Sequence, residues 1–426
     1  MIPKKTNHDQ GRLFESRLSE MLDPHNNLRL LADLIEWGQL EEELKVYFDQ
    51  EKGARGKPIR LVAGVLMLQH MTDISDEQIA VEWEQNPYWQ YFCGYDYLEW
   101  KFPMHPSSLS RWRKRLGKEG LQKVLQATLK LALATGLFKA SSFQSVIVDT
   151  TVMPKAVAYP TDARLYYKGL RTLVRKAKQS NLPLRQSYTF LSKRALRKTC
   201  QYAHARQMKR AKREMRRLHT YFGRVIRDIE RLIQGRKQEE QNFSSLLKIC
   251  NHVFRQQRTD KDKIYSIHEP EVECIAKGKA HKKYEFGCKA SIVLTHKEGL
   301  ALSVSAEHGR PYDGHTLKAS LKLAEELTGR AIKKGFVDRG YKGHQVEGIE
   351  IYISGKRGLS EHYKKLLRRR QAIEPHIGHM KSDGRLDRNH LKGKLGDQLH
   401  AILCGVGHNL RMVLGWLRQQ TRLKTA

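Results

Sequence analysis

The sequence lacks the segments that would place the chain in or across a membrane. None of its 426 residues belong to a run of about 20 apolar residues, the length that spans a bilayer. Residues 1–15 also lack the apolar region of a secretory signal peptide. We therefore expect a cytoplasmic protein with no membrane partner.

Cysteine is scarce, and its spacing excludes the common cysteine frameworks. No two of the six cysteines form a Cys-x-x-Cys pair, so neither a disulfide framework nor a zinc site is indicated. We expect reduced, mostly buried thiols. The six are Cys93, Cys200, Cys250, Cys274, Cys288 and Cys404.

Acidic residues are the minority. The chain has 45 Asp and Glu against 78 Lys and Arg, a net charge of +33, with an ordinary hydrophobic share of 40%. That share supports a folded protein of two to three domains. Because so large a positive charge favours contacts with a polyanion, nucleic acid is the expected partner.

The excess charge is concentrated in residues 164–217, which hold 18 Lys or Arg and one acid, Glu214. A solvated helical surface normally mixes both signs, because neighbouring like charges destabilise a helix. This segment lies in a helical stretch at about 155–265. Its apolar residues from Met208 to Leu232 alternate at spacings of three and four, which predicts a coiled-coil-like helix ending at Gly235. We expect its basic face to bind an anion.

Residues from about 12 to 137 have apolar residues at helical spacing and predict an all-helical domain at 1–140. Within it, a basic segment at 107–115 begins with Ser107 or Ser108 as its expected N-cap. With an earlier helix at 76–84 it could form a helix-turn-helix whose second helix enters a major groove. The alternative is a solvated basic face.

The period of the apolar residues changes after residue 140. Short apolar or alternating runs predict strands, and an amphipathic segment between the third and fourth strands predicts a helix. The order is strand, strand, strand, helix, strand, strand, helix, which is that of a ribonuclease-H-like core in an α+β or α/β fold. We therefore expect a second domain at 141–426, interrupted by the basic helical insertion. The expected strands are 145–149, 284–294, 300–306, 334–338 and 350–354, with helices at 317–327 and from about 360.

Three acidic residues fall where such a core would hold metal ions. Asp149 ends the first predicted strand, Asp338 ends the fourth, and Glu374 follows the last strand in a basic segment. Phosphodiester chemistry uses two Mg²⁺ ions about 3.5–4 Å apart, and such hard cations require carboxylate oxygens. Acids from separate elements can converge to hold both ions.

Taken alone, each acid has a simpler interpretation. Asp149 could cap the turn after it, and Asp338 could shape the turn at Gly340. Glu374 could be a surface acid beside Arg370, and the proline that follows it predicts a kink or helix boundary. Their joint order on the expected elements favours catalysis.

The acids lie within longer motifs: Val148-Asp149-Thr150-Thr151, Val337-Asp338-Arg339-Gly340-Tyr341-Lys342-Gly343 and Arg370-x-x-Ile373-Glu374-Pro375-x-Ile377-Gly378-x-x-Lys381. These resemble the three DDE blocks of bacterial insertion-sequence transposases, most closely the group usually called IS-five. The helical N-terminal region, with residues 106–111, also resembles that group. Leu367 departs from the pattern, because related transposases often have Tyr there.

The resemblance implies metal-dependent cleavage at terminal inverted repeats and attack of the freed 3′-OH on target DNA. Asp149, Asp338 and Glu374 would then be catalytic and would hold Mg²⁺, for which Mn²⁺ can substitute. The helical domain would bind the element ends, and the insertion would bind flanking or target DNA. The partners would be double-stranded DNA and a second copy of the chain on paired ends, at the nucleoid in the bacterial cytoplasm. The expected phosphate or DNA contacts are Arg370, Lys381, Arg339, Arg111, Arg113, Arg115, Arg213, Arg216 and Arg217.

Two alternatives fit the same residues. A ribonuclease-H-like nuclease would cut without strand transfer, and only a joining assay separates it from a transposase. A non-catalytic, transposase-derived DNA-binding protein would retain the charge but would not cleave DNA in the presence of metal.

Overall fold

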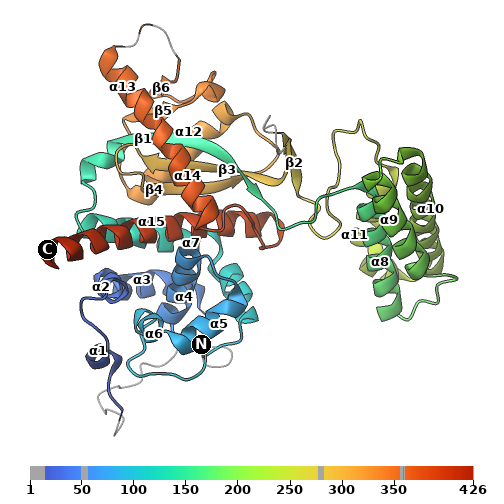
Figure 1. The fold of residues 1–426 in the computed structure, drawn as a ribbon, viewed down its shortest axis with the longest axis horizontal. Helices are drawn as coiled ribbons and strands as arrows, with labels where there is room; N and C mark the ends of the chain where they lie inside the picture. The colour runs from blue at the N-terminus through green and yellow to red at the C-terminus, as the bar shows by residue number, and fades with distance from the viewer. Residues whose placement is uncertain (1–14, 49–55, 277–282, 356–357, 359, 426) are drawn as a thin grey trace. The chain divides into compact units, whose positions relative to one another are not determined.

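A computed structural model describes residues 15–48, 56–276, 283–355, 358 and 360–425 (Figure 1). The chain forms two compact units, one of Met1–Pro154 with Cys288–Ala426 and one of Lys155–Gly287. The first unit contains the helical region and the strands predicted for the catalytic core, except residues 284–287 at the start of β3. The division at residue 140 therefore stays a prediction. No helix in the described ranges is long and apolar enough to cross a membrane.

The N-terminal region of the first unit is helical, as predicted. Its most apolar helix, α4, is buried along nearly its whole length, which explains why its sequence shows no polar face. Ser75 caps α5 in a capping box with Gln78. The helices are α1 (Leu18–Met21), α2 (Asn27–Leu34), α3 (Trp37–Leu44), η1 (Lys45–Tyr47), α4 (Ile59–Thr72), α5 (Asp76–Gln85), α6 (Pro87–Phe92) and α7 (Ser107–Ala134).

The predicted helix-turn-helix is wrong in its connection. Helix α6 and an irregular segment separate α5 from α7, so the two are not joined by the short turn of that motif. Neither predicted N-cap is correct, because α7 begins at Ser107 after Pro106 and has no side-chain cap. Gly117, at a φ of 63°, breaks α7 into a basic first part and an apolar second part.

The strands form one mixed sheet in the predicted order. Strand β1 pairs in parallel with β5, which pairs in parallel with β6, and β3 pairs antiparallel with β4. The path β2-β3-β1-β5-β6, with β4 on β3, is consistent with a ribonuclease-H-like core. Strand β2 was not predicted. The strands are β1 (Ser145–Pro154), β2 (Glu273–Ala276), β3 (Tyr284–Thr295), β4 (Ala301–Glu307), β5 (Lys334–Val337) and β6 (Glu350–Ile353).

Helices cover both faces of this sheet because alternate residues of each strand point to opposite sides. Val146 and Val148 share a core with Leu317 and Leu321 of α12. Ile147 instead packs in a second core with residues from α13, α14 and α15, including Leu367. Figure 1 shows α14 crossing the strands. These helices are α12 (Asp313–Thr328), α13 (Glu361–Arg369), α14 (Ile373–Ser382) and α15 (Gly393–Thr425); η2 (Ala140–Gln144), η3 (Arg339–Tyr341) and η4 (Arg370–Ala372) are short 3-10 turns.

Helix α15 joins the N-terminal helices to the sheet. The buried Asn409 amide bonds both backbone groups of Ala301 on β4, at 2.8 and 2.9 Å, and donates to Thr128 of α7 at 3.0 Å. Arg411 donates to the carbonyl oxygens of His70 and Asp383, at 2.7 and 3.0 Å. Core residues of α4, α7, β1 and α15 belong to one cluster. The N-terminal helices and the sheet thus share a core.

The second unit is a helical bundle rather than a two-stranded coiled coil. Leu218, Phe222 and Ile229 of the predicted apolar seam are fully buried, whereas Met208 at its start is exposed. Gly169 lets α8 approach α10, since a Cβ there would lie 2.7 Å from the Phe222 ring. Gly235 follows α10 at a φ of 81°, where a left-handed residue ends a helix. The helices are α8 (Asp162–Gln179), α9 (Thr189–His204), α10 (Met208–Ile233) and α11 (Lys237–Arg255).

The junction of α15 with α4 gives the first testable prediction. A Cβ at Gly407 would overlap the backbone carbonyl of His70, and backbone cannot easily shift. Gly407→Ala should therefore destabilise the fold by about 1–3 kcal/mol or more, the range for overpacked cores. Urea unfolding measures it. Gly415→Ala is the matched control on the same helix, because nothing lies within 4 Å of its Cβ position, and a small increase in stability is expected. Equal stability of the two variants would contradict this packing.

Candidate active site

Two of the predicted acids come from adjacent parallel strands. Ser145 lies opposite Lys334 and Ile147 opposite Phe336. Continuing this register by two residues places Asp149 level with Asp338. Burial raises the pKa of Asp149 to about 6, and the Asp338 charge adds to the rise. The Thr150 backbone N–H and the Arg370 guanidinium lower this pKa.

The prediction that Asp149 ends its strand is wrong. Asp149 lies near the middle of β1, which continues to Pro154. Its Oδ1 accepts a hydrogen bond from the Thr150 N–H at 2.8 Å. The parallel pairing with β5 stops at Ile147, so Asp149 lies just beyond the paired residues.

Asp338 follows β5 and shapes a turn. Its Oδ1 accepts from the Gly340 N–H at 2.8 Å and caps the short helix η3. A Cβ at Gly340 would lie 3.0 Å from this oxygen and 3.4 Å from Oδ2 of Asp313. The simpler interpretation of Asp338 as a turn residue is therefore correct for Oδ1. The hydrogen bond to Oδ1 also fixes the orientation of the carboxyl group, and with it the position of Oδ2.

Glu374 is the predicted acid that the structure does not bring into the cluster. It lies exposed in the first turn of α14, and within the described residues no hydrogen bond or ion pair joins it to Asp149 or Asp338. Arg370 instead pairs with Asp149, at 3.6 Å. The predicted helix boundary is confirmed, since η4 separates α13 from α14 just before Pro375. Helix α14 contacts β1, so Glu374 is on the helix next to the aspartates.

A third aspartate, Asp313, lies beside the first two and was missed by the sequence analysis. Its Oδ1 accepts from Lys289 Nζ and from Thr150 Oγ1, each at 2.9 Å. Its charge also raises the pKa of Asp149. One signal was present in the sequence, because Lys289 interrupts a buried strand and a buried lysine needs an acidic partner.

Tyr341 is a buried residue near this acidic group. Its side chain is fully buried. Burial raises the pKa of its hydroxyl, and the charges of Asp149, Asp313 and Asp338 raise it further. The hydroxyl therefore remains protonated, next to Thr150, at any physiological pH.

The comparisons with known proteins find transposase domains in two parts of the chain. Residues 16–115 match the family described as Transposase domain (DUF772), and residues 244–410 match the Transposase DDE domain. The chain belongs to the DDE transposases. A relative from Rhizobium meliloti, "Uncharacterized protein ORF8 in nfe locus", is 42% identical over 207 residues, which are 49% of this chain and 100% of that protein. No solved structure matches the transposase.

The matched DDE range includes Asp338 and Glu374 but not Asp149. The strand register, rather than the family match, therefore places Asp149 beside Asp338. The negative charges of Asp149 and Asp338 repel each other. A divalent cation bound between them would offset this repulsion, and hard divalent cations prefer oxygen ligands. The donor set of the site is thus compatible with the metal that DDE transposases use.

The three basic residues predicted to contact phosphate near the site of the transposase differ in their exposure and in what they contact. Arg370, with its side chain only 12% exposed, contacts Asp149. Arg339 is exposed, and its guanidinium lies against Gly355 in the turn after β6. Lys381 lies partly buried near the end of α14. Arg370 is the one that reaches the acidic group.

One predicted DNA contact in the N-terminal region is wrong. The Arg113 side chain is 3% exposed and forms an ion pair with Asp76 at 2.6 Å and a hydrogen bond with Gln69. Its position on the inner face of α7 makes it a structural link to α5. Arg111 and Arg115 are exposed on the same helix, and Arg115 stacks on Trp112.

The basic surface of the bundle unit is confirmed as exposed. A groove of about 430 Å³ runs along the start of α10. The Arg217 side chain is 54% exposed and forms an ion pair with Glu214, the one acidic residue of 164–217. The groove is lined by Lys209, Arg210, Lys212, Arg213 and Arg216.

The raised pKa of Asp149 predicts how stability depends on pH in metal-free transposase. A carboxyl with a raised pKa contributes stability that is present below its ordinary pKa and lost as pH rises through about 6. Asp149→Asn should therefore become more stable relative to the native protein by roughly 2 kcal/mol between pH 4 and pH 7, since each pKa unit corresponds to about 1.36 kcal/mol and part of the change already falls below pH 4.

Urea unfolding in chelator at both pH values tests this expectation. Asp387→Asn, which removes an exposed acid, is the control. A difference between Asp149→Asn and the native protein that is the same at pH 4 and pH 7 would contradict the electrostatic account of the site.

Proposed function

We propose that this transposase cleaves DNA at the terminal inverted repeats of an insertion sequence of the IS-five group and joins the freed 3′-OH to target DNA. The observation that supports this most is the convergence of Asp149 and Asp338 at the edge of adjacent strands, with Arg370 beside them. A ribonuclease-H-like sheet carries them.

Asp149 and Asp338 would hold Mg²⁺, with Glu374 completing the ligand set from α14. The metal supplies Lewis acidity and an activated oxygen nucleophile, and water or a 3′-OH can occupy the same position. Glu374 must approach the aspartates for this, and its location beside the η4 break gives the helix start a place to adjust.

Arg370 would change partners when DNA binds. In the structure it neutralises part of the charge on Asp149. Once a cation takes over that role, the guanidinium is left to donate to a phosphate oxygen, for which its fork geometry is suited. Lys289 and Thr150 hold Asp313 in place behind the site, so the positions of the acids do not depend on the metal alone.

Removing the charge of any one proposed ligand should abolish cleavage. Asp149→Asn, Asp338→Asn and Glu374→Gln each remove a charged oxygen donor without changing side-chain shape, so DNA binding should persist. The assay incubates the protein with Mg²⁺ and the DNA that flanks its gene, and maps cleaved and joined products to the nucleotide. Glu361→Gln, at an exposed acid of α13, should keep full activity.

Each other outcome of that assay has a distinct meaning. Full activity of one of the three variants would show that its acid is not a ligand. Cleavage without joining would favour a nuclease, and end binding without any cleavage would favour a non-catalytic DNA-binding protein.

The N-terminal helices should recognise the element ends through Arg111 and Arg115. Arg111→Ala should weaken binding to end DNA by about 1–3 kcal/mol and leave stability nearly unchanged. Arg113→Ala should instead destabilise the fold by about 3–5 kcal/mol, because it leaves Asp76 without its buried partner. Binding titrations and urea unfolding of the full chain separate the two effects. Loss of stability in both variants would contradict the assignment.

The basic groove of α10 should bind DNA phosphates. Replacing Lys209, Arg210, Lys212 and Arg213 by Gln should weaken binding to all duplexes about equally, because phosphates carry no sequence information. The slope of log affinity against log salt should become shallower by about 0.9 for each phosphate that the variant no longer neutralises. Joining should decrease more than cleavage.

A double control, Lys318→Gln with Lys322→Gln, removes exposed charge from α12 of the other unit. For each charge that it removes, this double variant should change the slope of log affinity against log salt much less than the quadruple variant does. A slope unchanged in the quadruple variant would mean that the groove of α10 is a solvated surface.

A further inference from the structure

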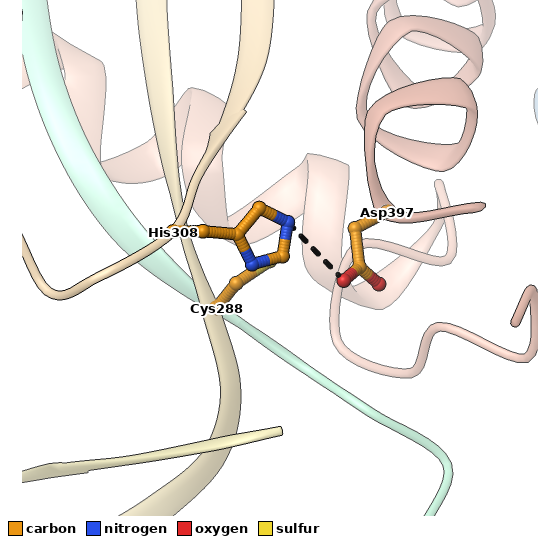
Figure 2. Close-up of side chains that lie close together, drawn as sticks. All are labelled: Cys288, His308 and Asp397. Carbon is orange, nitrogen blue, oxygen red and sulfur yellow. Dashed lines mark ion pairs between the residues drawn. The ribbon is translucent and has the colours of Figure 1, made fainter. Parts of the chain in front are cut away.

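A second cluster of metal-binding side chains lies away from the proposed catalytic acids. Cys288, His308 and Asp397 each offer one ligand atom, and these atoms all lie within 4.8 Å of one another. Figure 2 shows the Cys288 side chain beside the His308 ring and the Asp397 carboxylate facing that ring. The side chains of Cys288 and Asp397 are almost wholly buried, and that of His308 is 16% exposed.

The antiparallel hairpin of β3 and β4 sets two of these ligands. Lys289 lies opposite Glu307. Continuing the register by one residue places Cys288 directly opposite His308, and side chains of such a cross-strand pair have their Cβ atoms about 4.5–5.5 Å apart. The backbone therefore brings the thiol and the imidazole together before any ligand binds. The neighbouring Lys289 points to the opposite face of the sheet, where it meets Asp313.

The third ligand comes from α15 and is oriented by a neighbouring amide. The buried Asn389 donates to Oδ1 of Asp397 at 2.6 Å. This leaves Oδ2 of Asp397 facing Nε2 of His308 at 3.5 Å. A polar group that fixes the orientation of a ligating carboxylate is a regular part of metal sites.

The separation of these two atoms suits two ligands of one metal better than a hydrogen bond. Good N–H···O bonds measure about 2.7–3.2 Å. Nitrogen and oxygen bound to one tetrahedral Zn²⁺ at about 2.1 Å lie roughly 3.4 Å apart. A thiolate, a carboxylate and a neutral imidazole together carry two negative charges, which a divalent cation neutralises in a buried place.

We propose that Cys288, His308 and Asp397 bind a Zn²⁺ ion that fastens the β3–β4 hairpin to α15. The thiolate and imidazole select a borderline-soft transition metal over Mg²⁺, which requires oxygen ligands. Because two ligands come from the β3–β4 hairpin and the third from α15, the ion stabilises the arrangement of sheet and helix on which the first unit is built. Water takes the fourth position on the exposed side of His308.

Cobalt substitution tests the site directly, because Co²⁺ bound to a thiolate shows a ligand-to-metal charge-transfer absorption that carboxylate sites lack. The full chain, freed of metal and titrated with Co²⁺, should show this band, and Zn²⁺ should displace it. Cys288→Ser and His308→Gln should abolish or strongly weaken the band. Cys404→Ser is the matched control, a buried cysteine of the same unit outside the cluster, and should retain it.

Zn²⁺ should also raise the unfolding temperature of the native protein and of Asp338→Asn, but not that of Cys288→Ser. Asn389→Ala should bind Zn²⁺ about 10–100-fold more weakly while it keeps all three ligands. Absence of the charge-transfer band in the native protein, or its persistence in Cys288→Ser, would overturn the proposal. These measurements involve no DNA, so they fail or succeed independently of the transposition chemistry.

Discussion

The parallel pairing of β1 with β5 places two carboxylates at the same level of the sheet, and the rest of the site depends on their repulsion. Burial together with the Asp338 charge raises the pKa of Asp149 to about 6. In the structure Arg370 partly offsets this, at 3.6 Å. A polyanionic substrate cannot approach such a pair unless a cation comes with it. In the proposed mechanism, the same repulsion that destabilises the metal-free fold would favour binding of a divalent metal together with a phosphate.

The shared core explains how the fold tolerates this strain. Helix α15 packs against both the N-terminal helices and the sheet, and Asn409 links Ala301 of β4 to Thr128 of α7. The helices proposed to bind element ends are thus continuous with the sheet that carries the acids. A fragment that ended near residue 136 would lack α15 and expose its core, which is why end recognition is best measured on the full chain.

The elements of the core could be predicted from sequence because their apolar periods are local. The three acids and Pro375 also mark their elements locally. The remaining features depend on contacts that no local pattern encodes. Arg113 has the sequence setting of a basic surface residue until Asp76, on another helix, is placed against it. Likewise, Cys288 and His308 become neighbours only once the hairpin register is known.

The central claim is that Asp149, Asp338 and Glu374 together hold the metal, and the position of Mn²⁺ in crystals of the transposase with end DNA tests it most directly. Anomalous scattering should locate Mn²⁺ at about 2.0–2.3 Å from the Asp149 and Asp338 carboxylates. Glu374 should have turned in beside them, and Arg370 should contact a phosphate. Mn²⁺ found elsewhere, with Arg370 still paired to Asp149, would contradict the account.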